Sequence, residues 1–165
     1  MTSPDKTPPM LNEETAQFIH AYVSVNLATR SVDNRPAVTR AYGVRVADDR
    51  AAITVFMARP GNQSILDNIQ SNQHLAVCFS RPTTNRTLQL KARDAQLLPI
   101  AEADLVFITL YRQSMHEELR QLGFPASFIE ALIPTLGEND VAIRFTPLDA
   151  YIQTPGPDAG KKMPV

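Results

Sequence analysis

The sequence predicts a mainly β domain: a small closed barrel of five or six antiparallel strands with helices attached to it. The first observation is that short runs with an apolar residue at every second position recur along the chain, and Leu88 to Ala92 is the clearest of them. The second is that a single short stretch with helical spacing, 62–71, separates the third strand from the fourth. The chain has 165 residues, 44% of them hydrophobic, and no internal repeat, which fits one domain with its own core.

In the first half of the chain, turn-forming residues separate short elements. A proline-rich stretch predicts a loose tail over 1–11. Asn12 is followed by Glu13 and Glu14, which is typical of a capped helix start, so we expect a short helix from there to Tyr22. The elements expected after it are strands at 23–28, 37–46 and 51–58, a helix at 62–71 closed by Asn72, and a strand at 75–80.

The second half begins with the strand at 86–95, whose alternation predicts one core face and one polar face. Pro99 is expected to open a long helix over 100–122. Its apolar stripe would consist of Leu105, Ile108, Met115, Leu119 and Leu122. A helix at 127–133, a strand at 141–145 and a short strand at 150–153 follow. Residues 154–165 are rich in proline and glycine and predict an irregular tail, so the domain is expected to span 12–153.

The net charge of −1 conceals an uneven distribution. Residues 30–93 carry ten basic side chains against four acidic ones, a net charge of +6, whereas residues 1–29 and 94–165 carry −2 and −5. Nine of those ten basic residues are arginine, whose planar fork binds phosphate with two hydrogen bonds. The distribution indicates a small phosphorylated ligand bound locally and argues against nucleic acid as a partner.

Several other classes of function are not expected. No segment reaches the roughly 18 apolar residues that a membrane span needs, and residues 1–9 do not resemble a signal peptide, so we expect a cytoplasmic protein without a membrane partner. The lone cysteine, Cys78, is expected to be a small core residue rather than part of a disulfide. His20, His74 and His116 lie far apart without a metal-ligand spacing, so no metal site is expected.

The stretch from Pro36 to Leu97 resembles the pyridoxamine 5′-phosphate oxidase-like family of FMN-binding split β-barrels. The residues that carry the resemblance are Arg40 and Arg45, Thr54, the run from Asn68 to Phe79, and the run from Arg86 to Ala92. The long helix and the segment from Thr154 to Gly160 are similar to a branch of this superfamily distinct from the vitamin-B6 oxidases themselves. The resemblance implies a homodimeric, six-stranded antiparallel split β-barrel with a long helical insertion before the last strands, and FMN in a groove between the subunits.

The resemblance also implies which residues bind the cofactor. Arg40 and Arg45 would face the phosphate or the edge of the flavin ring, and Thr54 belongs to the same matching set. Thr87 falls where the oxidases carry a glutamine, and Gln89 and Lys91 share its face of the strand. The other interpretation of this face is a solvated outer wall.

One loop departs from the family. The oxidases place a Ser-Arg-Lys run at the entry to the short helix to bind the FMN phosphate, whereas this chain has Arg59-Pro-Gly-Asn-Gln-Ser-Ile65. When the loop is aligned with the family by the preceding strand, only Arg59 matches the Ser-Arg-Lys run. When it is aligned by the helix, Gln63 takes the serine position and Ile65 replaces the lysine. Free backbone N–H groups at the helix start, with Gln63, Ser64, Arg59 or Arg86, are expected to hold the phosphate instead. The alternative is an ordinary capped helix start.

The chain lacks the usual motifs for acid–base or nucleophilic catalysis, which suits a cofactor that carries the chemistry itself. We therefore expect an FMN-dependent oxidoreductase that acts on a small-molecule substrate. One alternative is a flavin- or haem-binding protein without turnover, such as a carrier, sensor or haem-utilisation factor; a deazaflavin is another candidate cofactor. A second is a cofactor-free dimeric barrel that uses its basic face to bind an acidic partner.

Overall fold

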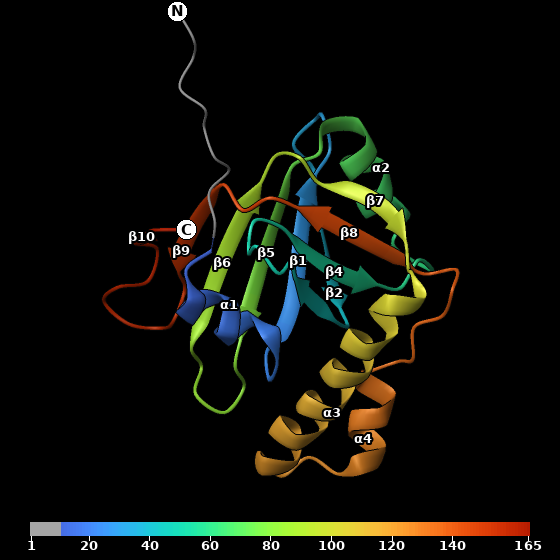
Figure 1. Ribbon diagram of the computed structural model, residues 1–165, viewed down its shortest axis with the longest axis vertical. Helices are drawn as coiled ribbons and strands as arrows, with labels where there is room; N and C mark the ends of the chain where they lie inside the picture. Colours follow the sequence, from blue (N-terminus) through green and yellow to red (C-terminus); the bar gives the residue numbers. More distant parts are fainter. Residues whose placement is uncertain (1–10) are drawn as a thin grey trace, which may run out of the picture.

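Residues 11–165 are described by the computed structural model, which consists of two antiparallel sheets with helices at their margins (Figure 1). The larger sheet has six strands in the order β10-β9-β6-β5-β1-β2: β1 (Ser24–Arg30), β2 (Pro36–Ala41), β5 (Leu75–Ser80), β6 (Thr87–Ala92), β9 (Asp149–Ile152) and β10 (Lys162–Met163). The smaller sheet has the order β3-β4-β8-β7: β3 (Val44–Val46), β4 (Ile53–Met57), β7 (Gln96–Pro99) and β8 (Val141–Phe145). The helices are α1 (Glu13–His20), α2 (Gln63–Asn72), α3 (Leu105–Gln121) and α4 (Ala126–Leu132).

The main hydrophobic core lies between the inner faces of the two sheets. In β6 the burial alternates as expected, with Leu88, Leu90 and Ala92 in the core and the intervening side chains on the other face. In β1 and β5 the same alternation places every second residue, such as Val25 and Phe79, in this core. The period-two pattern therefore fixes which side chains of the larger sheet face outward.

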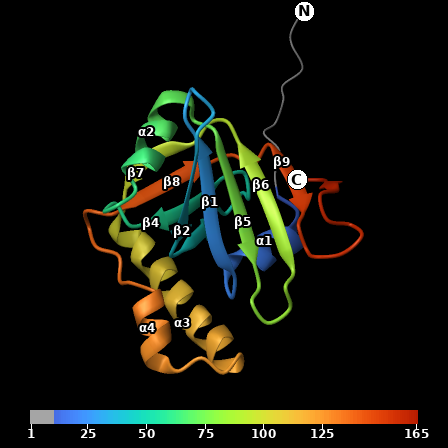
Figure 2. The ribbon, with the colours of Figure 1, turned by 180° about the vertical axis from the view of Figure 1, so that it is seen from behind.

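The two sheets differ in what covers their outer faces. A second apolar cluster, made of Phe56, Ala142, Ile108 and Leu136, joins the outer face of the smaller sheet to α3 and the segment after α4. All five residues of β4 are consequently buried, as in a strand with both faces covered. No described helix lies over the outer face of the larger sheet, where β2, β1, β5 and β6 lie side by side in the rear view (Figure 2).

The single strand expected at 37–46 is wrong, because it divides into β2 and β3, which belong to different sheets. The division falls at Tyr42 and Gly43, whose backbones exchange hydrogen bonds with Phe56 of β4. A Cβ on Gly43 would lie 2.8 Å from the Phe56 ring, so the chain can cross here only because Gly43 has no side chain.

The long helix begins later than expected. Residues 96–99 form β7, paired with β8, and a 3₁₀ turn (Glu102–Asp104) comes before α3 starts at Leu105. Pro99 therefore ends an edge strand, where a missing N–H is tolerated, and does not start a helix. Leu105 and Leu122, assigned to the apolar stripe, are 48% and 47% exposed, whereas Tyr111 on the same helix is buried.

The ends of the described chain are both packed against the rest. The N-cap at Asn12 is confirmed, since its Oδ1 accepts a 2.8 Å hydrogen bond from the Thr15 N–H. Leu11 is fully buried; residues 1–10 of the expected tail lie outside the described part of the chain. In the segment 154–165, Lys162 and Met163 form β10 on the edge of the larger sheet. Among the described residues, every helix is too short or too polar to cross a membrane.

Candidate functional site

The outer face of the larger sheet carries a row of polar side chains that runs across five strands. Register places Arg40 of β2 beside Asn26, Asn26 beside Cys78, Cys78 beside Gln89, and Gln89 beside Tyr151 of β9. Neighbouring strands lie about 4.8 Å apart, so this row extends over about 19 Å. We call this surface the outer face.

The two central strands of the outer face present only small side chains. These are Ser24, Asn26 and Ala28 on β1 and Ala76, Cys78 and Ser80 on β5, all of them half-buried. Longer side chains flank them on β2 and β6. A surface of small side chains with a polar border can accept a planar molecule or the same face of a second copy.

Three of the expected site residues, Thr87, Gln89 and Lys91, lie together on β6 and point to the outer face. The Thr87 and Ser80 hydroxyls share a hydrogen bond of 2.7 Å, and the Gln89 amide donates to Cys78 Sγ at 3.6 Å. Lys91 Nζ lies 4.8 Å from the centroid of the Tyr151 ring. The expectation that Cys78 lies in the core is wrong: it is half-buried on the outer face, where partial desolvation raises the pKa of its thiol and the Gln89 amide opposes that rise.

Arg40 lies at the other end of the row, next to a buried tyrosine of α3. The Tyr111 hydroxyl is buried and has no hydrogen-bond partner of good geometry in the described chain. Burial raises the pKa of Tyr111 to about 12, although the nearby Arg40 guanidinium and the Val25 backbone oppose the shift. The positive charge next to the unpartnered Tyr111 hydroxyl is thus the Arg40 guanidinium, at the border of the outer face.

Arg45 and Thr54 lie elsewhere, on the smaller sheet. Register places Thr54 of β4 between Arg45 and Arg144, and the three line a cleft of about 320 Å³. Arg45 Nη1 forms an ion pair of 3.0 Å with Asp104, a carboxylate that is 2% exposed. Asp104 therefore balances the charge that Arg45 brings to this cleft.

Of the expected phosphate-binding residues, Arg59, Gln63 and Arg86 are engaged in other contacts of the described chain, and Ser64 is not. Arg59 Nε donates to the Asn139 carbonyl at 2.9 Å, and the Gln63 amide donates to Asp67 at 2.7 Å. Ser64 is exposed at the start of α2. Arg86 forms a 2.8 Å ion pair with Glu14 and lies over the Phe18 ring. The ten expected residues thus fall into four groups rather than one cavity, and only Arg40, Thr87, Gln89 and Lys91 share the outer face.

No protein-family model matches the sequence, and no curated protein matches it. Solved structures do match. HupZ of Group A Streptococcus aligns with a TM-score of 0.56 at 13% identity, over 92% of this chain and 100% of that chain. A putative pyridoxamine 5′-phosphate oxidase of Lactobacillus delbrueckii aligns with a TM-score of 0.55 at 14% identity, over 88% of this chain and 97% of that chain. The chain has the fold of the pyridoxamine 5′-phosphate oxidase-like split barrels. An F420 reductase also aligns, with a TM-score of 0.53 at 15% identity over 85% of this chain and 98% of that chain.

Sequence reasoning missed two sets of residues on the outer face. Asn26 and Cys78 lie in the row between Arg40 and Gln89, and Tyr151 extends the row beyond Gln89; alternation in β1 and β5 was the signal for the first two. A second set, Arg30, His74 and Arg93, joins Lys91 around a pocket at one end of the outer face. These residues stand at strand ends, where periodicity does not say which side chains converge.

Proposed function

We propose that this protein is an FMN-dependent oxidoreductase that acts on a small molecule, with the flavin held on the outer face between two subunits. The observation that carries the proposal is the centre of the outer face, which carries small side chains and is not covered by any described helix. It is bordered by Arg40 on one side and by Thr87 and Gln89 on the other. The fold shared with a putative pyridoxamine 5′-phosphate oxidase supports the same function.

The residues on the outer face suit the ring of a flavin. Gln89 offers an amide that both donates and accepts hydrogen bonds, and Thr87 and Ser80 offer hydroxyls. Arg40 supplies a positive charge that favours electron-rich ligands, and the Tyr111 hydroxyl beside it has an unused hydrogen-bonding capacity. When bound, FMN supplies hydride and electron transfer, so the protein needs to orient the ring and shape the substrate pocket.

A second subunit would complete the groove. The half-buried small residues of β1 and β5 present a surface that two copies can bring together closely, whereas the outer face of the smaller sheet is already covered by α3. Two copies that pack through the outer face would shield the ring from water from above while each sheet supports it from below.

The absorption spectrum of the protein as purified, followed by an FMN titration, tests the proposal. We expect a flavin spectrum, and at least a tenfold loss of FMN affinity in Arg40→Ala and Thr87→Ala, because both remove polar contacts at the border of the groove. Arg120→Ala is the matched control, since Arg120 is exposed on α3 away from this face. A colourless protein whose melting temperature does not rise with FMN, or full occupancy in both variants, would contradict the proposal.

The second candidate is a flavin- or haem-binding protein without turnover. It is favoured by the scarcity of acid–base groups in the polar row, where the cysteine thiol has a raised pKa. A Soret band in place of a flavin spectrum would identify haem. An FMN-loaded protein that no reductant of the nicotinamide or small-molecule type can reduce would favour a carrier, and a preference for F420 over FMN would identify a deazaflavin cofactor.

A further inference from the structure

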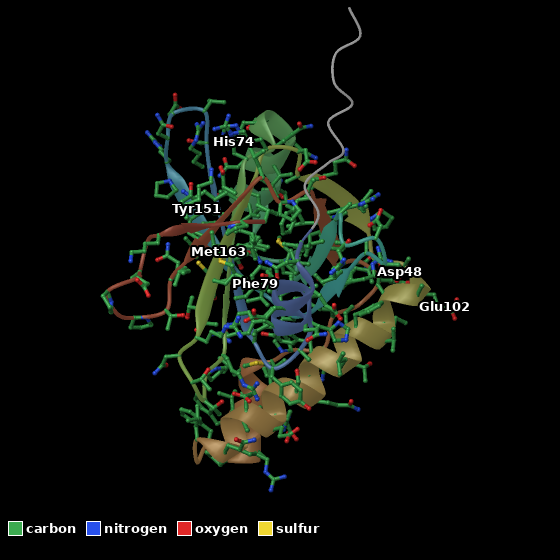
Figure 3. The ribbon with its side chains drawn as sticks, turned by 60° about the vertical axis from the view of Figure 1, so that its left-hand side comes forward. Asp48, His74, Phe79, Glu102, Tyr151 and Met163 are labelled. Atoms are coloured by element: carbon green, nitrogen blue, oxygen red, sulfur yellow. The ribbon has the colours of Figure 1, made fainter. Side chains whose placement is uncertain are left out.

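A pocket of about 430 Å³ opens at one end of the outer face, over the ends of β1, β5, β6 and β9. Its floor is formed by Ala28 and Ala76, which are paired in register, and by Lys91, which pairs with Ala76. The two alanines leave a hollow because the side chains around them are much longer. Figure 3 shows His74 beside α2 and Tyr151 below it on β9, at the left of the view.

The walls of the pocket carry an excess of positive charge. Arg30, Lys91 and Arg93 line it with one carboxylate, Asp149. Asp149 forms its ion pair with Lys162, and this lysine, together with Arg93 and Lys91, lowers the pKa of Asp149. Within residues 11–165, no carboxylate lies within ion-pair distance of Arg30, Lys91 or Arg93. No carboxylate of the described chain therefore competes with an anionic ligand for these three cations.

Neutral partners hold Arg30 in place. Its guanidinium donates to Asn34 Oδ1 and to His74 Nδ1, both at 3.0 Å. Because a guanidinium only donates, His74 Nδ1 must accept, and the ring proton is on Nε2. The histidine thus has a donor left over at the wall of a cationic pocket, and a side chain fixed in advance loses less entropy when an anion binds.

The start of α2, where the family resemblance locates phosphate binding, offers fewer groups that could bind a phosphate. Arg59 and Gln63 are engaged by protein groups, and the lysine of the family pattern is replaced by Ile65. Within the described residues, the pocket at the end of the outer face brings together three cations without a carboxylate partner, whereas the start of α2 offers one, Arg59. From this contrast we propose that the pocket formed by Arg30, His74, Lys91 and Arg93 binds the phosphate group of a phosphorylated small molecule. That the molecule is FMN rests on the function proposed above; the phosphate site itself does not.

Titration of the full chain with inorganic phosphate, followed by ³¹P NMR at constant ionic strength, tests the site. We expect saturable binding that weakens at least tenfold in Arg30→Gln and in Arg93→Gln, since each removes a charge-assisted contact. Arg120→Gln removes the same charge from an exposed position on α3 and should change the affinity less than twofold. The melting temperatures of all three variants without phosphate establish that the fold is intact.

A parallel titration with FMN and with riboflavin, which lacks the phosphate, identifies the source of the phosphate group. If the flavin supplies it, FMN binds at least tenfold more tightly than riboflavin, and Arg30→Gln removes most of that preference. Saturable phosphate binding without any flavin binding would support the phosphate site and contradict FMN as its ligand. Non-saturable phosphate binding, or equal weakening in Arg30→Gln, Arg93→Gln and Arg120→Gln, would overturn the phosphate site even if both flavins bind.

Discussion

At the scale of single residues, Tyr111 is the side chain whose surroundings are most unusual. It comes from α3, packs edge-to-face against Tyr42 with ring centroids 6.5 Å apart, and has its hydroxyl buried near Arg40. A buried hydroxyl without a good partner is destabilising as a neutral group at every pH, and burial disfavours its ionised form more strongly. The part of the cost that depends on pH should therefore appear only at high pH.

The substitution Tyr111→Phe tests this directly. The pKa of Tyr111 is raised from 10.0 to about 12 in the folded chain, so above pH 10 the unfolded chain releases this proton first and the free energy of unfolding falls. Near pH 12 the loss from this one group is on the order of 2 kcal/mol. Urea unfolding at pH 8 and pH 11.5 should show a smaller loss in Tyr111→Phe than in the parent chain. Equal losses in the two proteins would show that burial does not disfavour ionisation of Tyr111.

At the scale of the elements, the crossing between β2 and β3 decides whether the two sheets can form from one chain. The crossing is tight because the backbone of Gly43 lies against Phe56 of β4 and Ile108 of α3. The Phe56 ring is fully buried between the smaller sheet and α3, so it cannot move aside.

Gly43→Ala should therefore destabilise the fold. The added methyl group would lie 2.8 Å from the Phe56 ring, and overpacking of this kind costs about 1–3 kcal/mol. Gly137→Ala is the matched control, because nothing lies within 4 Å of its added methyl group. Denaturant midpoints of the two variants give the comparison; an unchanged midpoint in Gly43→Ala would mean that the crossing can open at no cost.

The same crossing shows where sequence reasoning stopped. Alternation located most strands and fixed the inward residues of β6, because a period of two is a local property. It did not reveal that 37–46 changes sheets, since the residues on both sides of Gly43 keep the apolar character of a strand. Nor could it distinguish Leu105 and Leu122, which are exposed, from Tyr111, because the covered side of a helix depends on where the helix packs.

The candidate site, like the fold, was predictable from the sequence only where a local pattern determines it. That Thr87, Gln89 and Lys91 share a face followed from their spacing. Arg45 and Arg59 are separated from them because β3 and β4 belong to the smaller sheet, and sheet membership depends on long-range pairing. Cys78 was assigned to the core because its neighbours are apolar. Its strand lies in a sheet with one covered face, and no local pattern states that the second face is free.

At the scale of the whole molecule, the basic block and its acidic flanks meet in space. Three arginines of the block are paired with carboxylates of the flanking segments: Arg45 with Asp104, Arg81 with the fully buried Glu118, and Arg86 with Glu14. These pairs fix the hairpin after β5 and the crossing strand β3 to the surrounding helices. The unneutralised part of the block, with Arg30, Arg40 and Lys91, remains on the outer face and gives that face its positive charge.

The outer face is also where we expect two copies to associate. Its central side chains are small and half-buried, and apolar residues such as Val38 stand exposed on its border.

Cys78→Arg would place a long, charged side chain in the middle of the outer face while leaving the core unchanged, because residue 78 points away from the core. Burying an unpaired charge in an interface costs several kcal/mol, so the dimer dissociation constant should rise at least a hundredfold. Sedimentation velocity over a range of concentrations measures this, with Gln113→Arg on the exposed side of α3 as the control that keeps the parent value. A parent chain that stays monomeric, or a Cys78→Arg variant that dimerises as the parent does, would place the interface elsewhere.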